Sequence, residues 1–168
     1  MTDARARFCE QYAADVLRWV IRLGGPHVHA EDVAQDVFTV ALRRMSTFRG
    51  DSSERTWLFS ITRNVVRNAR RRSALRRFVG FDSLPEPPSS EPGPSERLES
   101  ARRRAAVQRS LGKLSTAHRE ALVLVDMEGH TAKEAGAMLA VPEGTISSRL
   151  HHARKAFAAA LKREGIEG

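Results

Sequence analysis

A stretch rich in proline and serine, FDSLPEPPSSEPGPS at residues 81–95, sets the strongest limit on how this chain can fold. Proline fixes φ and lacks a backbone N–H, and the stretch has no apolar periodicity, so it fits neither a helix nor a central strand. Its composition is typical of an extended linker. We therefore expect two small domains, residues 1–80 and 96–168, joined by an acidic linker, although length alone also allows a single domain.

Residues 1–80 contain three runs of apolar side chains at spacings of three and four, the pattern of amphipathic helices. The first run ends at Gly24, the second extends from about Ala30 to Met45, and the third starts near Thr56 after a polar loop at 46–55. The inward residues are Phe8, Tyr12, Val16, Trp19, Val20 and Leu23, then Val33, Val37, Val40 and Ala41, then Trp57, Leu58, Ile61 and Val65. This half is predicted to be all-α.

In residues 96–168 the clearest local signal is a helix-turn-helix pattern between Gly129 and Leu161. Thr131 and Glu134 have the spacing of a capping box, which starts a helix. Pro142 ends that helix and suits the first position of the next one, so a tight turn is predicted. Two earlier helical runs, separated by a break at 112–115, are expected to complete a four-helix domain.

The second helix of this pair has two different sides. Ile146, Leu150, Ala153 and Phe157 form its apolar stripe. The other side is polar and basic and carries Thr145, Ser147, Ser148, Arg149, His151, His152, Arg154 and Lys155. Such a helix fits the major groove of DNA. A helical hairpin with a solvated charged face gives the same pattern, and both interpretations remain open at this point.

The third helix of the first half carries a second polar stripe. Asn64, Arg67, Asn68 and Arg71 follow one another at positions i, i+3, i+4 and i+7. Amide and guanidinium groups in a row suit a nucleic-acid strand, whereas a solvated arginine-rich helix end is the plainer alternative. The net charge of +8 and the pI near 10.9 also favour a polyanionic partner.

An acidic patch interrupts this basic composition at Glu31, Asp32, Gln35 and Asp36. Acids at a helix N-terminus interact favourably with the helix dipole, which explains the first two of these residues. A metal-dependent nuclease would need further carboxylates and a general base, which are not apparent. A protein-docking patch is the third interpretation. We expect no enzyme activity, no metal and no cofactor.

Cysteine content and the first residues of the chain indicate the cellular compartment in which the protein works. Cys9 is the only cysteine, so an internal disulfide is excluded, and no Cys/His spacing matches a zinc finger. The first fifteen residues lack a long apolar run, so we expect neither a signal peptide nor membrane insertion. The cytoplasm is the expected location. A sensory metal site among the six histidines and Cys9 is a weaker alternative.

Three segments resemble motifs of bacterial sigma-70 family sigma factors of the extracytoplasmic-function group. They are AEDVAQDVF at 30–38, WLFSITRN at 57–64 and GTISSRL at 144–150, in the family's order and with a linker between domains. Thr62, Ala135-Gly136 and Ala140 stand where the family usually has Ala, Ile-Ala and Gly. The resemblance implies a promoter-specificity subunit that directs transcription initiation at a bipartite −10/−35 promoter.

The resemblance also implies partners and contact residues. The β′ clamp helices of core RNA polymerase would bind Asp32, Gln35, Asp36 and Phe38. The single-stranded −10 element would contact Phe48, Arg49, Asn64, Arg67, Asn68 and Arg71, with the loop at 48–55 holding a flipped-out base. Duplex DNA at −35 would contact Thr145, Ser147, Ser148, Arg149, His151, His152 and Arg154. An anti-sigma factor would hold the protein inactive.

Two other functions remain as alternatives. A stand-alone DNA-binding regulator would use the same helix-turn-helix on an operator without polymerase. A helical nuclease would use Glu31, Asp32 and Asp36 with a metal ion. Neither explains the WLFSITRN helix together with the linker.

Overall fold

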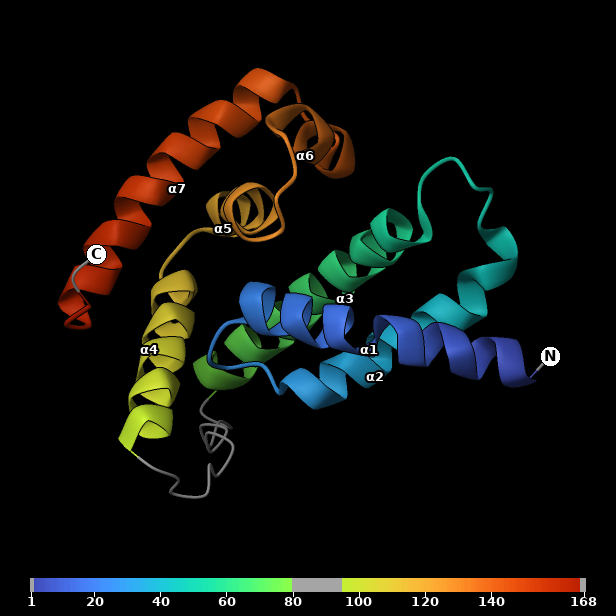
Figure 1. The fold of residues 1–168 in the computed structure, drawn as a ribbon, viewed down its shortest axis with the longest axis horizontal. Helices are drawn as coiled ribbons and strands as arrows, with labels where there is room; N and C mark the ends of the chain where they lie inside the picture. Colours follow the sequence, from blue (N-terminus) through green and yellow to red (C-terminus); the bar gives the residue numbers. More distant parts are fainter. Residues whose placement is uncertain (1, 80–94, 167–168) are drawn as a thin grey trace. The chain divides into compact units, whose positions relative to one another are not determined.

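The computed structural model describes residues 2–79 and 95–166, and every regular element in these two ranges is helical (Figure 1). The all-α prediction is therefore confirmed. The chain separates into two compact units, at residues 1–85 and 86–168. The predicted linker lies outside the described residues, apart from Ser95 at the start of a helix. No described helix has the length and apolar character needed to cross a membrane.

The N-terminal unit consists of α1 (Thr2–Gly24), α2 (Ala30–Arg44), the 3-10 turn η1 (Met45–Thr47) and α3 (Glu54–Phe78). Each of the three α-helices packs against the other two. Trp19 of α1 is almost fully buried, and its ring lies edge-on to Phe59 of α3 with centroids 5.2 Å apart. This aromatic pair packs among aliphatic side chains and the buried Phe8 in the core of the unit.

Helix bounds in this unit differ from the sequence prediction by a few residues. Helix α1 begins before the predicted apolar run, and α2 gives way to η1 at Met45. Helix α3 begins at Glu54, because the Ser53 side chain accepts a hydrogen bond from the Thr56 N–H at 3.1 Å and caps the helix earlier. Its inward side includes Val66, and the predicted Val65 is only half-buried.

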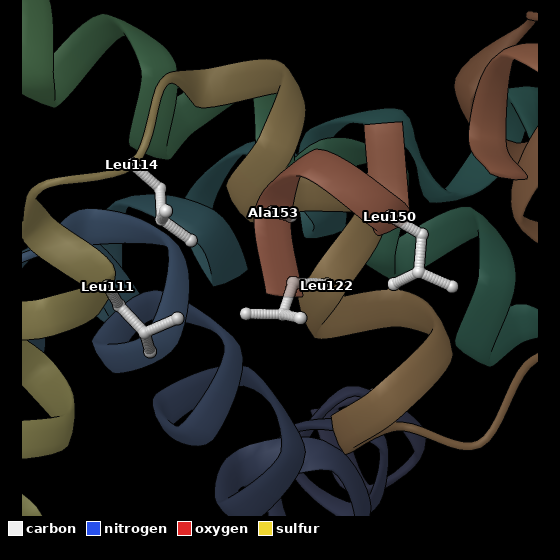
Figure 2. Packing of buried hydrophobic residues seen from close by; sticks show 5 residues of the cluster. All are labelled: Leu111, Leu114, Leu122, Leu150 and Ala153. Atoms are coloured by element: carbon white, nitrogen blue, oxygen red, sulfur yellow. The ribbon is translucent and has the colours of Figure 1, made fainter. Parts of the chain in front are cut away.

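The C-terminal unit consists of α4 (Ser95–Gly112), α5 (Thr116–Leu122), the π-helical segment η2 (Val123–Met127), α6 (Ala132–Leu139) and α7 (Glu143–Arg163). Helix α7 packs against α4, α5 and α6. Figure 2 shows the core cluster that joins α4, α5 and α7: Leu111, Leu114, Leu122, Leu150 and Ala153. The sequence did not predict the π-helical segment.

Specific local features define both ends of α6 and the start of α7. Thr131 and Glu134 form both bonds of the predicted capping box: the Glu134 N–H donates to Thr131 Oγ1 at 3.2 Å, and the Thr131 N–H donates to Glu134 Oε2 at 2.8 Å. Ala140 then takes the left-handed conformation, with φ 54° and ψ 46°. Pro142 is the N-cap of α7 and not its predicted first residue, so the helix begins one residue later, at Glu143.

The left-handed Ala140 leads to a stability prediction. A Cβ in this conformation costs about 1 kcal/mol, a cost that glycine does not carry. Ala140→Gly is therefore expected to stabilise the C-terminal unit by about 1 kcal/mol, measured by urea unfolding. The matched control is Ala137→Gly at an exposed position of α6, which should lower the free energy of unfolding by about 1 kcal/mol. Equal destabilisation by both changes would contradict this account.

Candidate nucleic-acid interfaces and a docking face

Helix α7 turns its predicted apolar stripe inward and its polar side outward. Ile146, Leu150 and Ala153 are buried, and Phe157 packs against the same core. The polar positions are therefore presented along the outer side. Ser147, Ser148, His151 and His152 are exposed, and Thr145 and Arg149 are half-buried.

Arg154 differs from the other predicted −35 residues because Asp126 holds it. Its Nε and Nη2 atoms donate to the two carboxylate oxygens of Asp126 at 2.9 and 2.7 Å. These hydrogen bonds raise the pKa of Arg154 above its ordinary value. Asp126 belongs to the π-helical segment η2, and sequence reasoning did not identify it. The pair ties α7 to η2, so two of the Arg154 donor atoms are already engaged.

A histidine group lies at the junction of α5 and α7. The ring of His118 is stacked on that of His152 with centroids 6.1 Å apart, and His151 lies edge-on to His152 at 5.4 Å. The sequence did not predict that His118 lies beside His152, because 33 intervening positions separate the two residues. In the described ranges, no group of three or more His, Cys, Asp or Glu residues is placed to hold a metal ion.

The second candidate interface is the outer side of α3. Leu58, Ile61 and Val66 are buried on the inner side. The predicted polar stripe lies opposite: Asn64, Asn68 and Arg71 are exposed, and Arg67 is half-buried. Thr62, which departs from the family motif, is fully buried and donates its hydroxyl to the Leu58 carbonyl at 2.9 Å. That hydrogen bond satisfies the buried hydroxyl within its own helix.

The loop before α3 rests on aromatic side chains at one end. The ring of Phe48 lies 5.2 Å from that of Trp57, which in turn lies 6.5 Å from Phe8 of α1. Arg49 is exposed at the start of the loop. Arg55, predicted to be in the loop, belongs instead to the first turn of α3. The segment free of helix is therefore residues 48–53.

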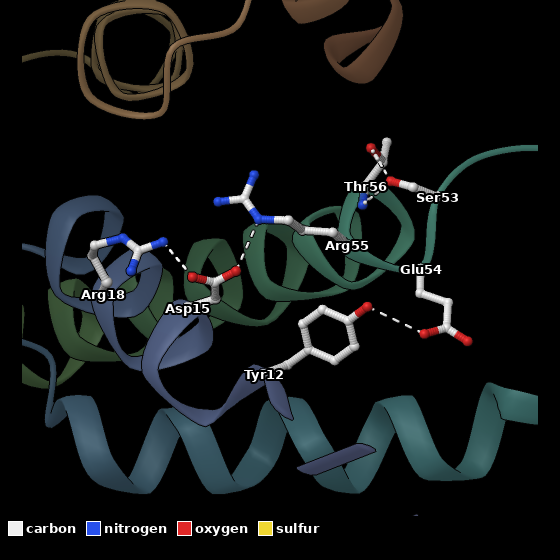
Figure 3. A network of polar contacts seen from close by, with 7 residues as sticks. All are labelled: Tyr12, Asp15, Arg18, Ser53, Glu54, Arg55 and Thr56. Carbon is white, nitrogen blue, oxygen red and sulfur yellow. Dashed lines mark hydrogen bonds and ion pairs between the residues drawn. The ribbon is translucent and has the colours of Figure 1, made fainter. Parts of the chain in front are cut away.

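A polar network joins α1 to the first turn of α3 (Figure 3). The Tyr12 hydroxyl donates to Glu54 Oε2 at 3.2 Å. Asp15 accepts hydrogen bonds from Arg55 Nε at 2.8 Å and from Arg18. Burial acts to raise the pKa of Asp15, and the hydrogen bonds from Arg55 and Arg18 outweigh it, so that pKa lies below its ordinary value. No sequence signal pointed to this network, because Asp15 and Arg55 are 40 positions apart.

Helix α2 presents the acidic patch on its solvent side. Asp32, Gln35 and Asp36 are exposed, opposite the buried Val33 and Val37. Asp32 lies in the first turn, where its charge also interacts favourably with the helix dipole. The patch is an outward face of one helix, the arrangement expected of a docking surface.

Two further features complete this face. Asp36 forms an exposed ion pair with Arg72 of α3 at 3.7 Å, a contact that contributes little free energy in water. Phe38, the fourth predicted polymerase contact, is half-buried at the edge of the face.

Comparison with known proteins identifies relatives of both units. Residues 8–76 match the family model of sigma-70 region 2, and residues 104–157 match that of sigma-70 region 4. The sigma factor SigE of Mycolicibacterium smegmatis is 35% identical over 150 residues, which are 86% of this chain and 56% of that relative. The chain thus spans just over half of SigE. The sigma factor SigL of Mycobacterium tuberculosis is 31% identical over 94% of this chain and 88% of its own length.

Two solved structures resemble the chain over nearly its full length. The sigma factor RpoE, in complex with the anti-sigma factor NepR from Bartonella quintana, gives a TM-score of 0.73 at 25% identity and covers 96% of this chain and 98% of its own. CnrH, in complex with the cytosolic domain of CnrY, gives a TM-score of 0.67 at 28% identity, with 97% and 90% covered.

Proposed function

The chain belongs to the extracytoplasmic-function group of the sigma-70 family of RNA polymerase sigma factors, and we propose that its three outward polar faces bind core polymerase, the −10 element and the −35 element. The observation that carries this proposal is that the fold exposes, fully or partly, the polar contact residues of the three family motifs. Each motif lies on a helix whose apolar side is buried and whose family-specific polar residues are exposed or half-exposed.

Docking on polymerase is assigned to the outer face of α2. Asp32, Gln35 and Asp36 offer carboxylate and amide oxygens to a basic helical surface of the β′ subunit, with Phe38 at the edge. Charge complementarity of this kind accelerates association and selects the partner. The ion pair between Asp36 and Arg72 is weak enough to exchange for a partner's cation.

Recognition of −35 duplex is assigned to α7. The N-terminal part of this helix enters the major groove, where Ser147, Ser148 and Arg149 reach base edges or phosphates. His151 and His152 follow one turn later, toward the backbone of the duplex. Arg154 provides a cation whose position is fixed by its two hydrogen bonds to Asp126, and its remaining donors are available to a phosphate.

Recognition of the melted −10 strand is assigned to α3 and the loop at 48–53. The stripe Asn64, Arg67, Asn68 and Arg71 follows the strand, and Arg49 adds a cation at the loop. Extruding a base from the duplex costs a few kcal/mol, which binding in a pocket offsets. Phe48, with its ring on Trp57, forms a wall of that pocket.

The remaining assignments follow from the same function. Residues 81–95 serve as a linker between a polymerase- and −10-binding domain at 1–80 and a −35-binding domain at 96–168. The chain catalyses no reaction itself, since polymerase supplies the chemistry, and it works in the cytoplasm.

An anti-sigma factor controls the protein, a proposal supported by the similar sigma factor RpoE in complex with the anti-sigma factor NepR. The last turn of α3 and its C-cap leave Leu75, Phe78 and Val79 exposed at 64%, 89% and 56%, an apolar surface that such a partner covers. Copurification from stationary cells tests this point. Recovery of polymerase subunits alone would remove its support.

The decisive experiment is run-off transcription by core polymerase, with and without this chain, on a library of randomised promoter fragments. Specific transcripts that need the chain and share a −10 and a −35 motif are the expected result. Tight and specific duplex binding that never yields transcripts would favour the stand-alone regulator instead. Metal-dependent cleavage of the fragments would favour a nuclease.

Arg149→Ala is expected to weaken −35 duplex binding by roughly 1–3 kcal/mol and to relax the preference at one base pair. The measurement is a fluorescence titration with the selected −35 duplex and its three variants at that position. An equal loss on every duplex would instead identify Arg149 as a phosphate contact.

A further inference from the structure

Helix α1 carries no residue with an assigned role in promoter recognition, yet it holds the first turn of α3. Tyr12 binds Glu54, and Asp15 binds the adjacent Arg55 (Figure 3). The guanidinium of Arg55 also lies over the ring of the buried Trp19, 5.1 Å from its centroid. Arg55 is thus fixed by a carboxylate and by an aromatic face that both belong to α1.

The first turn of α3 determines where the loop at 48–53 ends. Ser53 accepts from the Thr56 N–H, donates its hydroxyl to Thr56 Oγ1 at 3.0 Å, and receives the Trp57 N–H on its carbonyl at 3.0 Å. Any tilt of this turn therefore moves Ser53 with it. Because Arg55 belongs to the same turn, the contact with Asp15 fixes this end of the loop.

The other end of the loop depends on the same region. The Phe48 ring packs on Trp57, and Trp57 contacts Phe8 of α1. Both ends thus rest where α1 meets α3, while residues 49–52 between them are exposed. A loop anchored in this way keeps its shape only while the α1–α3 junction holds.

We propose that Asp15 is a positioning residue for −10 recognition, which acts through Arg55 to hold the base-binding loop at 48–53 in its working shape. This inference rests on the proposed function of that loop. Asp15 does not contact DNA in this account. Its carboxylate accepts hydrogen bonds from two arginines at once, whereas the amide of asparagine has the same length but only one acceptor oxygen and no charge.

The test uses holoenzyme made from core polymerase and the full chain. We would measure its affinity for a fluorescent single-stranded −10 oligonucleotide taken from the selected promoters, and for oligonucleotides with each other base at the flipped position. Asp15→Asn is expected to bind the −10 strand about tenfold more weakly, the loss typical of one charge-assisted hydrogen bond. Discrimination between the four bases should fall as well.

Three comparisons separate positioning from a general structural effect. Asp15→Asn should leave core polymerase affinity and −35 duplex affinity unchanged, Asp15→Glu should restore most of the −10 affinity, and Arg55→Gln should reproduce the defect from the other side of the contact. Glu10→Gln, which removes a charge from an exposed position of the same helix, is the matched control and should bind as wild type.

The outcomes are distinguishable. Unchanged −10 binding by Asp15→Asn and Arg55→Gln, next to normal wild-type binding, would overturn this inference alone. Loss of core binding in parallel with −10 binding and with a lower Tm would also overturn it, since that marks a structural residue. Wild-type holoenzyme without affinity for any −10 strand would overturn the proposed function and this inference with it.

Discussion

Core RNA polymerase is expected to bind the Asp32→Ala/Gln35→Ala variant at least about thirtyfold more weakly than the wild-type chain. Both side chains are exposed on the outer side of α2, whose inner side is fixed in the core by Val33 and Val37. Truncating a polar group that a partner desolvates leaves the partner's cation unpaired, which costs roughly 2–5 kcal/mol. Run-off transcripts should disappear at limiting concentrations of the chain, and a fluorescence titration measures the affinity.

The control for this variant is Glu31→Ala. Glu31 shares the first turn of α2 with Asp32 and has the same favourable interaction with the helix dipole, but the family motif assigns it no contact. If the acids serve only the helix dipole, both variants should lose a few tenths to about 1 kcal/mol of stability and keep full polymerase binding. That result would remove α2 as the docking face.

Gly136→Val is expected to destabilise the C-terminal unit by roughly 2–4 kcal/mol. A Cβ on Gly136 would lie 2.8 Å from the carbonyl oxygen of Val141, within the turn that joins α6 to α7. The same turn is held by the Val141 N–H, which donates to the Gly136 carbonyl at 2.9 Å, so it cannot retreat without losing that hydrogen bond. A branched side chain makes the clash worse than alanine does.

The expected readout is a thermal transition of the C-terminal unit lowered by at least about 8 °C, together with faster amide exchange in α6 and α7. Gly144→Val provides the matched control, because no atom lies within 4 Å of a Cβ at Gly144. It should change the transition little. Similar losses in both variants would show that the close approach at Gly136 does not cause the effect, since valine has a higher helix propensity than glycine.

Sequence patterns within a few residues determined much of this protein. The capping box at Thr131 and Glu134 and the inward stripe of α7 depend on contacts between positions three and four apart, and both are confirmed in the structure. The all-α class follows from the same short-range periodicity. The docking and DNA-contact roles of the exposed residues remain predictions, because exposure permits a contact without identifying the partner.

Only the tertiary structure decided which charged side chains meet. Asp15 pairs with Arg55 and Asp126 pairs with Arg154, across separations of 40 and 28 positions. Local periodicity carries no information at such distances, since any of the 28 lysines and arginines could have served either carboxylate. The packing of α1 on α3, and of the π-helical segment beside α7, selected these partners. Short-range spacing therefore determined the helices and their faces, whereas helix packing decided the contacts that position them.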